Sequence, residues 1–223
     1  MTAKLFFSAI AKFLAGVLLV GLLLFLPAGT LAYFNGWLLM GILFIPMFFA
    51  GIVMMVKNPA LLAKRLDAKE KQKGQGTVVK LSGLMFLCGF VLAGLGHRFS
   101  WYTLPRGVAI AAAVLFLVAY ILYAEVLREN TYLSRTIEVQ EGQRVIDTGL
   151  YGIIRHPMYS VTLLLFLSMP LVLGSLYAFI VFLAYPFIIA ARIRGEEAFL
   201  EKELDGYAAY KQKVKYRLIP FIW

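Results

Sequence analysis

Four apolar blocks of about 20 residues each constrain this chain more than any other feature of its sequence. An α-helix rises about 1.5 Å per residue, so a block of this length crosses the roughly 30 Å hydrocarbon core of a bilayer. Only 15% of the residues are charged, against about 25% in an ordinary soluble domain. The sequence therefore predicts an all-α polytopic membrane protein with four spans, at Leu5–Leu26, Tyr33–Val56, Val78–Gly96 and Gly107–Leu127.

The first apolar block has an alternative interpretation as a cleaved signal peptide. Lys4 and Lys12 precede or interrupt its apolar core, and the stretch 30–32 loosely resembles a small-residue cleavage site. We expect a membrane span instead, because without this block the spans would no longer place the basic loops on the cytoplasmic side, as described next.

Basic residues are distributed unequally between the loops, and this inequality predicts the orientation of the spans. The stretch 57–80 holds seven basic residues against two acids, whereas 27–36 has no charge and 97–106 has only Arg98 and Arg106. Since Lys and Arg are retained on the cytoplasmic side, 20 of the 22 basic residues are expected to face the cytoplasm. The net charge of +10 therefore reflects the orientation of the spans. The basic inner face can attract anionic membrane lipid, and we expect no nucleic-acid partner. The inner loop's charges are Lys57, Lys64, Arg65, Asp67, Lys69, Glu70, Lys71, Lys73 and Lys80.

A fifth apolar region, residues 159–191, is too long for one untilted span. Pro170, Gly174 and Ser175 lie at its middle, which predicts a membrane helical hairpin that breaks within 169–175 and returns the chain to the cytoplasmic side. We divide the chain into a four-span membrane region, 1–127, and a core that contains the hairpin, 128–223. Residues 128–155 are expected to form an ordered cytoplasmic loop, and 192–223 a pair of cytoplasmic amphipathic helices.

Two polar patches flank the hairpin, at Arg155–Tyr159 and Arg192–Glu197. The hairpin would make them neighbours, and together they offer guanidinium donors, carboxylate acceptors and aromatic faces, which suit an amino-acid sulfonium ligand. The alternative is structural: the first patch anchors the hairpin at the headgroups, and the second is a snorkelling arginine pair followed by a solvated turn. With one cysteine and two histidines, the chain has too few ligands for an expected metal site.

Four sequence strings in this region resemble the isoprenylcysteine carboxyl methyltransferase family and its phospholipid methyltransferase relatives. The resemblance covers about residues 125 to 221 and implies an integral membrane enzyme that binds S-adenosyl-L-methionine (S-adenosylmethionine) in a cytoplasm-facing pocket closed by the C-terminal helices. Its acceptor would be lipophilic: a small molecule, a lipidated substrate or a membrane lipid that carries a carboxylate or another headgroup. The strings are GLYGIIRHPMY at 149–159, RIRGEE at 192–197, YAAY at 207–210 and RLIP at 217–220.

The same resemblance assigns roles to individual residues. Arg192 would lie at the acceptor, and Glu196 would be the acid that contacts the cofactor. Glu197 would be a second catalytic group, since an amine acceptor must lose a proton, to Glu197 or to His156. The remaining cofactor-binding residues implied by the resemblance are Gln143, Arg144, Val145, Ile146, Tyr151, Arg155, His156, Pro157 and Tyr159.

Two other functions stay open at this point. A membrane sterol or polyisoprenoid reductase that uses NADPH looks similar in the same C-terminal region, although this chain has no Gly-Asp after Tyr159 and no cysteine in its final helices. A non-enzymatic transporter or scaffold would place ionisable residues at mid-bilayer, where the first four blocks have almost none. We expect a multi-pass protein of a prokaryotic inner membrane, with its active site facing the cytoplasm.

Overall fold

The computed structural model describes residues 3–67, 75–134 and 136–223. Its long helices confirm the all-α polytopic class. Three of the predicted spans lie within one helix each, which extends one to three residues beyond them, and the helix of the second span begins one residue later than predicted, at Phe34. These helices are α1 (Ala3–Ala28), α2 (Phe34–Lys57), α4 (Gln75–Arg98) and α5 (Arg106–Glu129).

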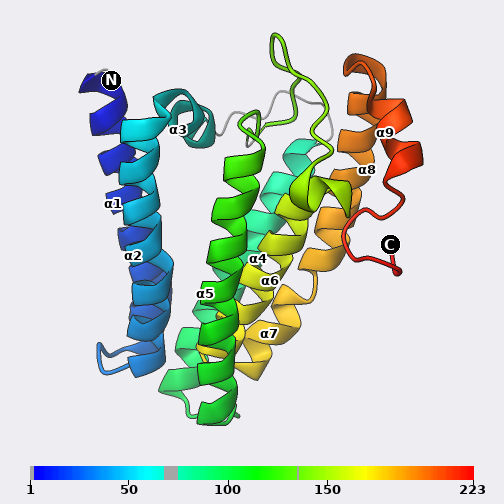
Figure 1. The fold of residues 1–223 in the computed structure, drawn as a ribbon. Coiled ribbons are helices and arrows are strands. Elements are labelled where there is room, and N and C mark those ends of the chain that lie inside the picture. The colour runs from blue at the N-terminus through cyan, green and yellow to red at the C-terminus, as the bar shows by residue number, and fades with distance from the viewer. Residues whose placement is uncertain (1–2, 68–74, 135) are drawn as a thin grey trace.

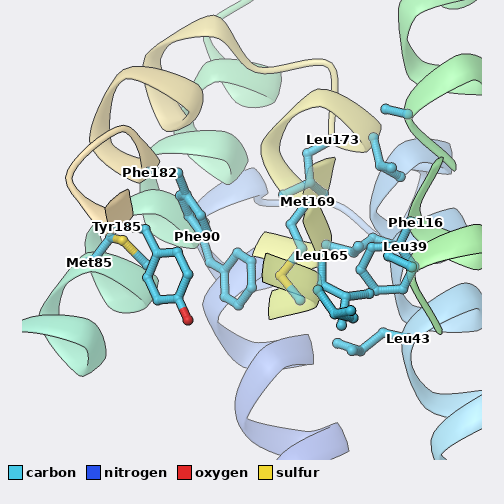
Figure 2. Packing of buried hydrophobic residues seen from close by; sticks show 14 of the residues in the cluster. Leu39, Leu43, Met85, Phe90, Phe116, Leu165, Met169, Leu173, Phe182 and Tyr185 are labelled. Carbon is cyan, nitrogen blue, oxygen red and sulfur yellow. The ribbon is translucent and has the colours of Figure 1, made fainter. Parts of the chain in front are cut away.

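The helices pack side by side, and α4 lies against α1, α7 (Leu176–Phe182) and α8 (Tyr185–Glu203) (Figure 1). Glycines in α4 permit this close approach: a Cβ on Gly89 would lie 2.3 Å from the Phe182 ring, and one on Gly94 would lie 2.5 Å from the Leu24 carbonyl oxygen. Small residues at helix contacts are a general means of packing helices in membranes. Figure 2 shows the resulting core, in which Phe182 and Phe90 lie beside side chains of α6.

The predicted hairpin break is confirmed. Helix α6 (Pro157–Val172) ends at a turn in which Gly174 has a φ of +70°, a left-handed conformation that glycine adopts readily. The Ser175 hydroxyl then caps α7 by accepting a hydrogen bond from the Ala178 amide at 3.2 Å. The returning stretch Leu176–Glu203 is long and apolar enough to span a bilayer, whereas α6, with 16 residues, is shorter than a full span.

The expected pair of amphipathic helices after residue 192 was partly wrong. Helix α8 continues through Arg192 to Glu203 without interruption, so the charged segment is an extension of the hairpin arm. The second helix, α9 (Tyr207–Lys213), is present and follows a tight turn at Gly206, whose φ is +82°. The reason is that no helix breaker separates the apolar arm from the charged stretch, since the lone Gly195 is tolerated within a helix.

A short helix that the sequence analysis did not predict, α3 (Pro59–Leu66), lies in the basic loop. The Asn58 side chain caps it by accepting a hydrogen bond from the Leu61 amide at 3.0 Å, and Pro59 occupies its first turn. Lys12 of α1 donates a hydrogen bond to the Leu66 carbonyl at 2.6 Å, which joins the end of α3 to the first span. Several charges named in the topology argument lie outside the described residues: Lys69, Glu70, Lys71 and Lys73.

The connections alternate between the two ends of the helix bundle. Helix α3, the loop at 130–148 and α9 lie at one end, whereas the α1–α2 and α4–α5 connections and the hairpin turn lie at the other (Figure 1). The hairpin turn is held there, because the Leu104 amide donates to the Gly174 carbonyl at 2.9 Å. The loops predicted to face the cytoplasm therefore share one end of the structure.

Candidate functional site

A cavity of about 500 Å³ lies at the end of the bundle that carries α3 and α9. Its volume is within the range of ligand sites in proteins, roughly 300–1,000 Å³. The loop after α5, the start of α6, the end of α8 and helix α9 surround its polar part. Its apolar part extends between α4 and the hairpin, along Val79, Gly83, Phe86 and Phe166.

All but two of the residues assigned to the site from the sequence line this cavity. They come from the loop, from both polar patches and from the 3₁₀ turn at Gly149–Gly152, so the cavity joins groups that are about 50 positions apart in the chain. Pro157 and Glu197 are not among the lining residues. The residues that line it are Gln143, Arg144, Val145, Ile146, Tyr151, Arg155, His156, Tyr159, Arg192 and Glu196.

A hydrogen-bonded chain connects the two patches at the centre of the cavity. The Tyr159 hydroxyl of α6 donates to a carboxylate oxygen of Glu196 and accepts a hydrogen bond from Arg192 Nε at 3.0 Å. Arg192 and Glu196 lie one helical turn apart on α8, so both can reach Tyr159. The prediction that the hairpin makes the patches neighbours is confirmed by these contacts.

Glu197 occupies a different position from its neighbour Glu196. Its side chain is 3% exposed and lies among two guanidinium groups and an imidazole. Arg155 Nε donates to Glu197 Oε1 at 2.7 Å, Arg217 Nε donates to Oε2 at 2.9 Å, and His156 Nε2 is 3.1 Å from Oε1. These contacts engage both carboxylate oxygens away from the cavity, which favours a structural role for Glu197.

Arg155 fastens the C-terminal segment to the start of α6. Its Nη1 donates to the carbonyls of Val214 and Lys215 at 2.7 and 2.8 Å, and its backbone amide donates to the Tyr216 carbonyl at 2.9 Å. The His156 amide continues this pairing by donating to the Arg217 carbonyl at 2.9 Å. Three N–H donors of the Arg155 side chain are therefore used within the protein. Pro157 follows as the first residue of α6, a position for which proline is well suited.

The sequence analysis quoted Tyr207 and Tyr210 but did not assign them to the site. Both line the cavity, and the Tyr210 hydroxyl donates to the Tyr151 carbonyl at 2.7 Å, which joins α9 to the 3₁₀ turn. The Tyr207 side chain is 4% exposed, and its hydroxyl has no hydrogen-bond partner in the described part of the chain. Burial raises the pKa of the Tyr207 phenol, and the negative charge of Glu197 and Glu196 adds to the effect. Their i, i+3 spacing in the YAAY string was the signal that could have identified them.

Other lining residues were missed because they belong to no recognisable sequence pattern. Asn130, Tyr132 and Thr136 come from the loop after α5, and Arg65 comes from the unpredicted helix α3. No group of three or more metal-ligating side chains occurs within residues 3–67, 75–134 and 136–223.

Comparison with known proteins shows what part of this chain is similar to. Residues 106–205 match the phospholipid methyltransferase family, which confirms the resemblance to the isoprenylcysteine and phospholipid methyltransferases and supports a membrane methyltransferase. A Delta(14)-sterol reductase from Mus musculus is 30% identical over 91 residues, or 40% of this chain. The match spans only 22% of that relative's length.

Proposed function

We propose that this protein transfers a methyl group from S-adenosylmethionine to the polar head of a lipophilic acceptor in the membrane, an isoprenylcysteine-type carboxylate or a lipid headgroup. The single observation that carries the proposal is the cavity that joins Tyr159, Arg192 and Glu196 within the stretch that matches the phospholipid methyltransferases. Its polar part suits a nucleoside with an amino-acid tail, and its apolar part suits a hydrocarbon chain. We assign the cofactor-binding core to residues 128–223, as the resemblance implies.

The residues present fit this cofactor. The buried Tyr207 hydroxyl has no hydrogen-bond partner among the residues that the structure describes, and a buried polar group without one is costly unless a ligand supplies it. Glu196 gives a carboxylate for the ammonium group, and the tyrosine rings give aromatic faces for adenine or for the sulfonium. Arg155 is engaged by Glu197 and by the C-terminal segment, so we assign the cofactor's carboxylate to Arg144 and Gln143 of the loop.

The chemistry needs alignment more than acid–base catalysis. When bound, S-adenosylmethionine supplies a methyl group that is already activated for in-line displacement. The protein's part is to hold the acceptor in line and to exclude water. In this proposal Arg192 orients the acceptor's polar group, and Tyr159 holds Arg192 and Glu196 at a fixed distance from each other. Glu197 and Arg155 hold the C-terminal segment against the start of α6, where Arg155 and His156 line the cavity.

We propose that the cavity faces the cytoplasm, in a prokaryotic inner membrane, because the basic loops lie at its end. Cys88 would be replaced by Ala, and single cysteines placed at Gln140 and at Tyr102 would be labelled in sealed, oriented vesicles. Only the cysteine at position 140 should react from the cytoplasmic side. Reaction of position 102 from that side would invert the topology.

The relative from Mus musculus makes an NADPH-dependent reductase the second candidate. Isothermal titration with S-adenosylhomocysteine and with NADPH separates the two functions on the same sample. We expect saturable binding of S-adenosylhomocysteine and none of NADPH. Tight binding of NADPH alone would end the methyltransferase proposal. A screen of membrane lipids for transfer of isotopically labelled methyl would then identify the acceptor.

A further inference from the structure

Helix α3 brings a fourth guanidinium group to the cavity. Arg65 lies outside the stretch that matches the methyltransferase family, yet it lines the cavity with Arg144, Arg155 and Arg192. The lining carboxylates within the described residues are Glu138 and Glu196. Arg155 is engaged by Glu197, so Arg65, Arg144 and Arg192 stand against the two lining carboxylates, and the site carries an excess of positive charge.

The Arg65 side chain is held in place without an acidic partner. Its Nη2 donates to the hydroxyl of Tyr123 on α5, and its guanidinium carbon lies 5.6 Å from the centre of the Tyr123 ring. None of the ionic contacts within residues 3–67, 75–134 and 136–223 involves Arg65. The planar guanidinium is therefore oriented by a neutral phenol, and its charge is available to a ligand.

Arg65 reaches the cavity beside α5, because Tyr123 of that helix holds its guanidinium group. Arg65, held by Tyr123, and Arg192, held by Tyr159, are thus two guanidinium groups of one cavity that are each oriented by a tyrosine hydroxyl. Because the cofactor's carboxylate is assigned to Arg144 and Gln143, Arg65 is left for the acceptor. A guanidinium group forms paired hydrogen bonds with a carboxylate or a phosphate, and a lysine does not reproduce this geometry.

We propose that Arg65 is an acceptor-specificity residue that binds an anionic group, a carboxylate or a phosphate, on the lipophilic acceptor. This inference deepens the proposed methyl transfer and rests on it for the identity of the bound molecule as an acceptor. The acceptor class is then an amphiphile with an anionic head, and neutral amphiphiles of the same chain length bind more weakly.

Binding of simple amphiphiles tests the proposal without knowledge of the natural acceptor. Radiolabelled laurate, dodecyl phosphate and dodecanol share one chain and differ in the head, so they separate a carboxylate site, a phosphate site and a purely apolar site. Equilibrium binding is measured with the full chain in phosphatidylcholine nanodiscs, with and without S-adenosylhomocysteine. Wild-type protein should bind at least one of the two anions more than tenfold tighter than dodecanol.

Arg65→Gln removes the charge, and Lys64→Gln is the matched control. Lys64 is the preceding residue of α3, bonds to Gln140 and is absent from the cavity lining. Arg65→Gln should reduce the preference for the anion at least fivefold, and Lys64→Gln should retain it. Equal binding of all three amphiphiles by the wild-type protein, or equal losses in the two variants, would overturn the proposal.

Binding of S-adenosylhomocysteine on the same samples separates this inference from the proposed function. If the nucleoside binds and no anion preference depends on Arg65, the inference fails alone. If the nucleoside does not bind and the preference depends on Arg65, the anion site stands and the methyltransferase proposal fails. Arg65→Lys should show an intermediate preference, because the charge remains and the paired donors are lost.

Discussion

The buried carboxylate of Glu197 helps hold the C-terminal segment against the start of α6, and removing its charge should release that segment. Arg155, His156 and Glu197 are 7%, 5% and 3% exposed, so the variant Glu197→Gln leaves a buried guanidinium with a neutral amide as its partner. Breaking a buried ion pair by changing one partner costs about 3–5 kcal/mol. About 1.4 kcal/mol corresponds to a tenfold change in an equilibrium constant. The equilibrium constant for opening of the segment should therefore rise at least about 100-fold.

Hydrogen exchange measures this opening directly. The amides of Arg155 and His156 donate to the carbonyls of Tyr216 and Arg217, so their exchange rates report separation of the C-terminal segment from α6. Glu197→Gln should accelerate exchange in peptides that cover residues 150–160 by about two orders of magnitude, and it should also weaken binding of S-adenosylhomocysteine.

Glu201→Gln is the control for this experiment. Glu201 lies one turn further along α8 and pairs with Lys211 at 2.9 Å, but the two side chains are 46% and 27% exposed. An exposed pair contributes about 0–1 kcal/mol, so exchange in residues 150–160 should change less than about fivefold. Equal exchange rates in the two variants would refute the structural role of Glu197 and return it to the catalytic role expected in the sequence analysis, as a base for an amine acceptor.

Two further variants test the roles assigned to the cavity, and a third tests an exposed ion pair of the fold. Glu196→Gln should weaken binding of S-adenosylhomocysteine more than tenfold in a calorimetric titration, and unchanged affinity would remove Glu196 from the cofactor site. Arg192→Ala should lower methyl-transfer turnover more than nucleoside affinity; equal losses in both would contradict its place at the acceptor. A hydrogen bond from Lys213 lowers the pKa of the Asp147 carboxyl, so the pair stabilises the fold above about pH 4 and loses this effect as the pH falls through the lowered pKa. The difference in apparent melting temperature between wild type and Asp147→Asn should therefore vanish at low pH, and a difference that grows with acidity would show that the sign is wrong.

The sequence predicted the spans and the hairpin because their signals are local. A run of about 20 apolar residues or a cluster of Pro and Gly can be recognised without knowledge of what packs against it. The role of Glu197 also had a local signal that was not used. Tyr185, Ile189, Ile193 and Glu197 repeat every four residues and are all buried, so Glu197 continues the packed face of α8.

The contribution of the first half of the chain to the site could not be predicted in this way. Val79 and Gly83 line the cavity because α4 packs beside the hairpin, and Arg65 reaches it from α3, which packs against α2; no spacing in the sequence encodes these contacts. The division at residue 128 therefore separates the cofactor motifs from part of the cavity that surrounds them. Short α3 escaped prediction for a related reason: its eight residues are stabilised by the Asn58 cap and by packing of Leu61 and Leu62, not by a long periodic pattern.

The interruption between α7 and α8 explains how the two polar patches meet. From the hairpin turn to Tyr159, α6 has about 13 residues and rises about 20 Å, whereas about 20 residues separate the turn from Glu196 in the returning arm, a rise of about 30 Å if straight. A continuous return helix parallel to α6 would carry Glu196 about two turns past Tyr159. The break at residues 183–184 lets α8 start anew, and the Tyr185 hydroxyl fixes that start by donating to Thr162 at 2.9 Å. The Tyr159–Glu196 hydrogen bond at the centre of the cavity shows that the two arms meet beyond this interruption.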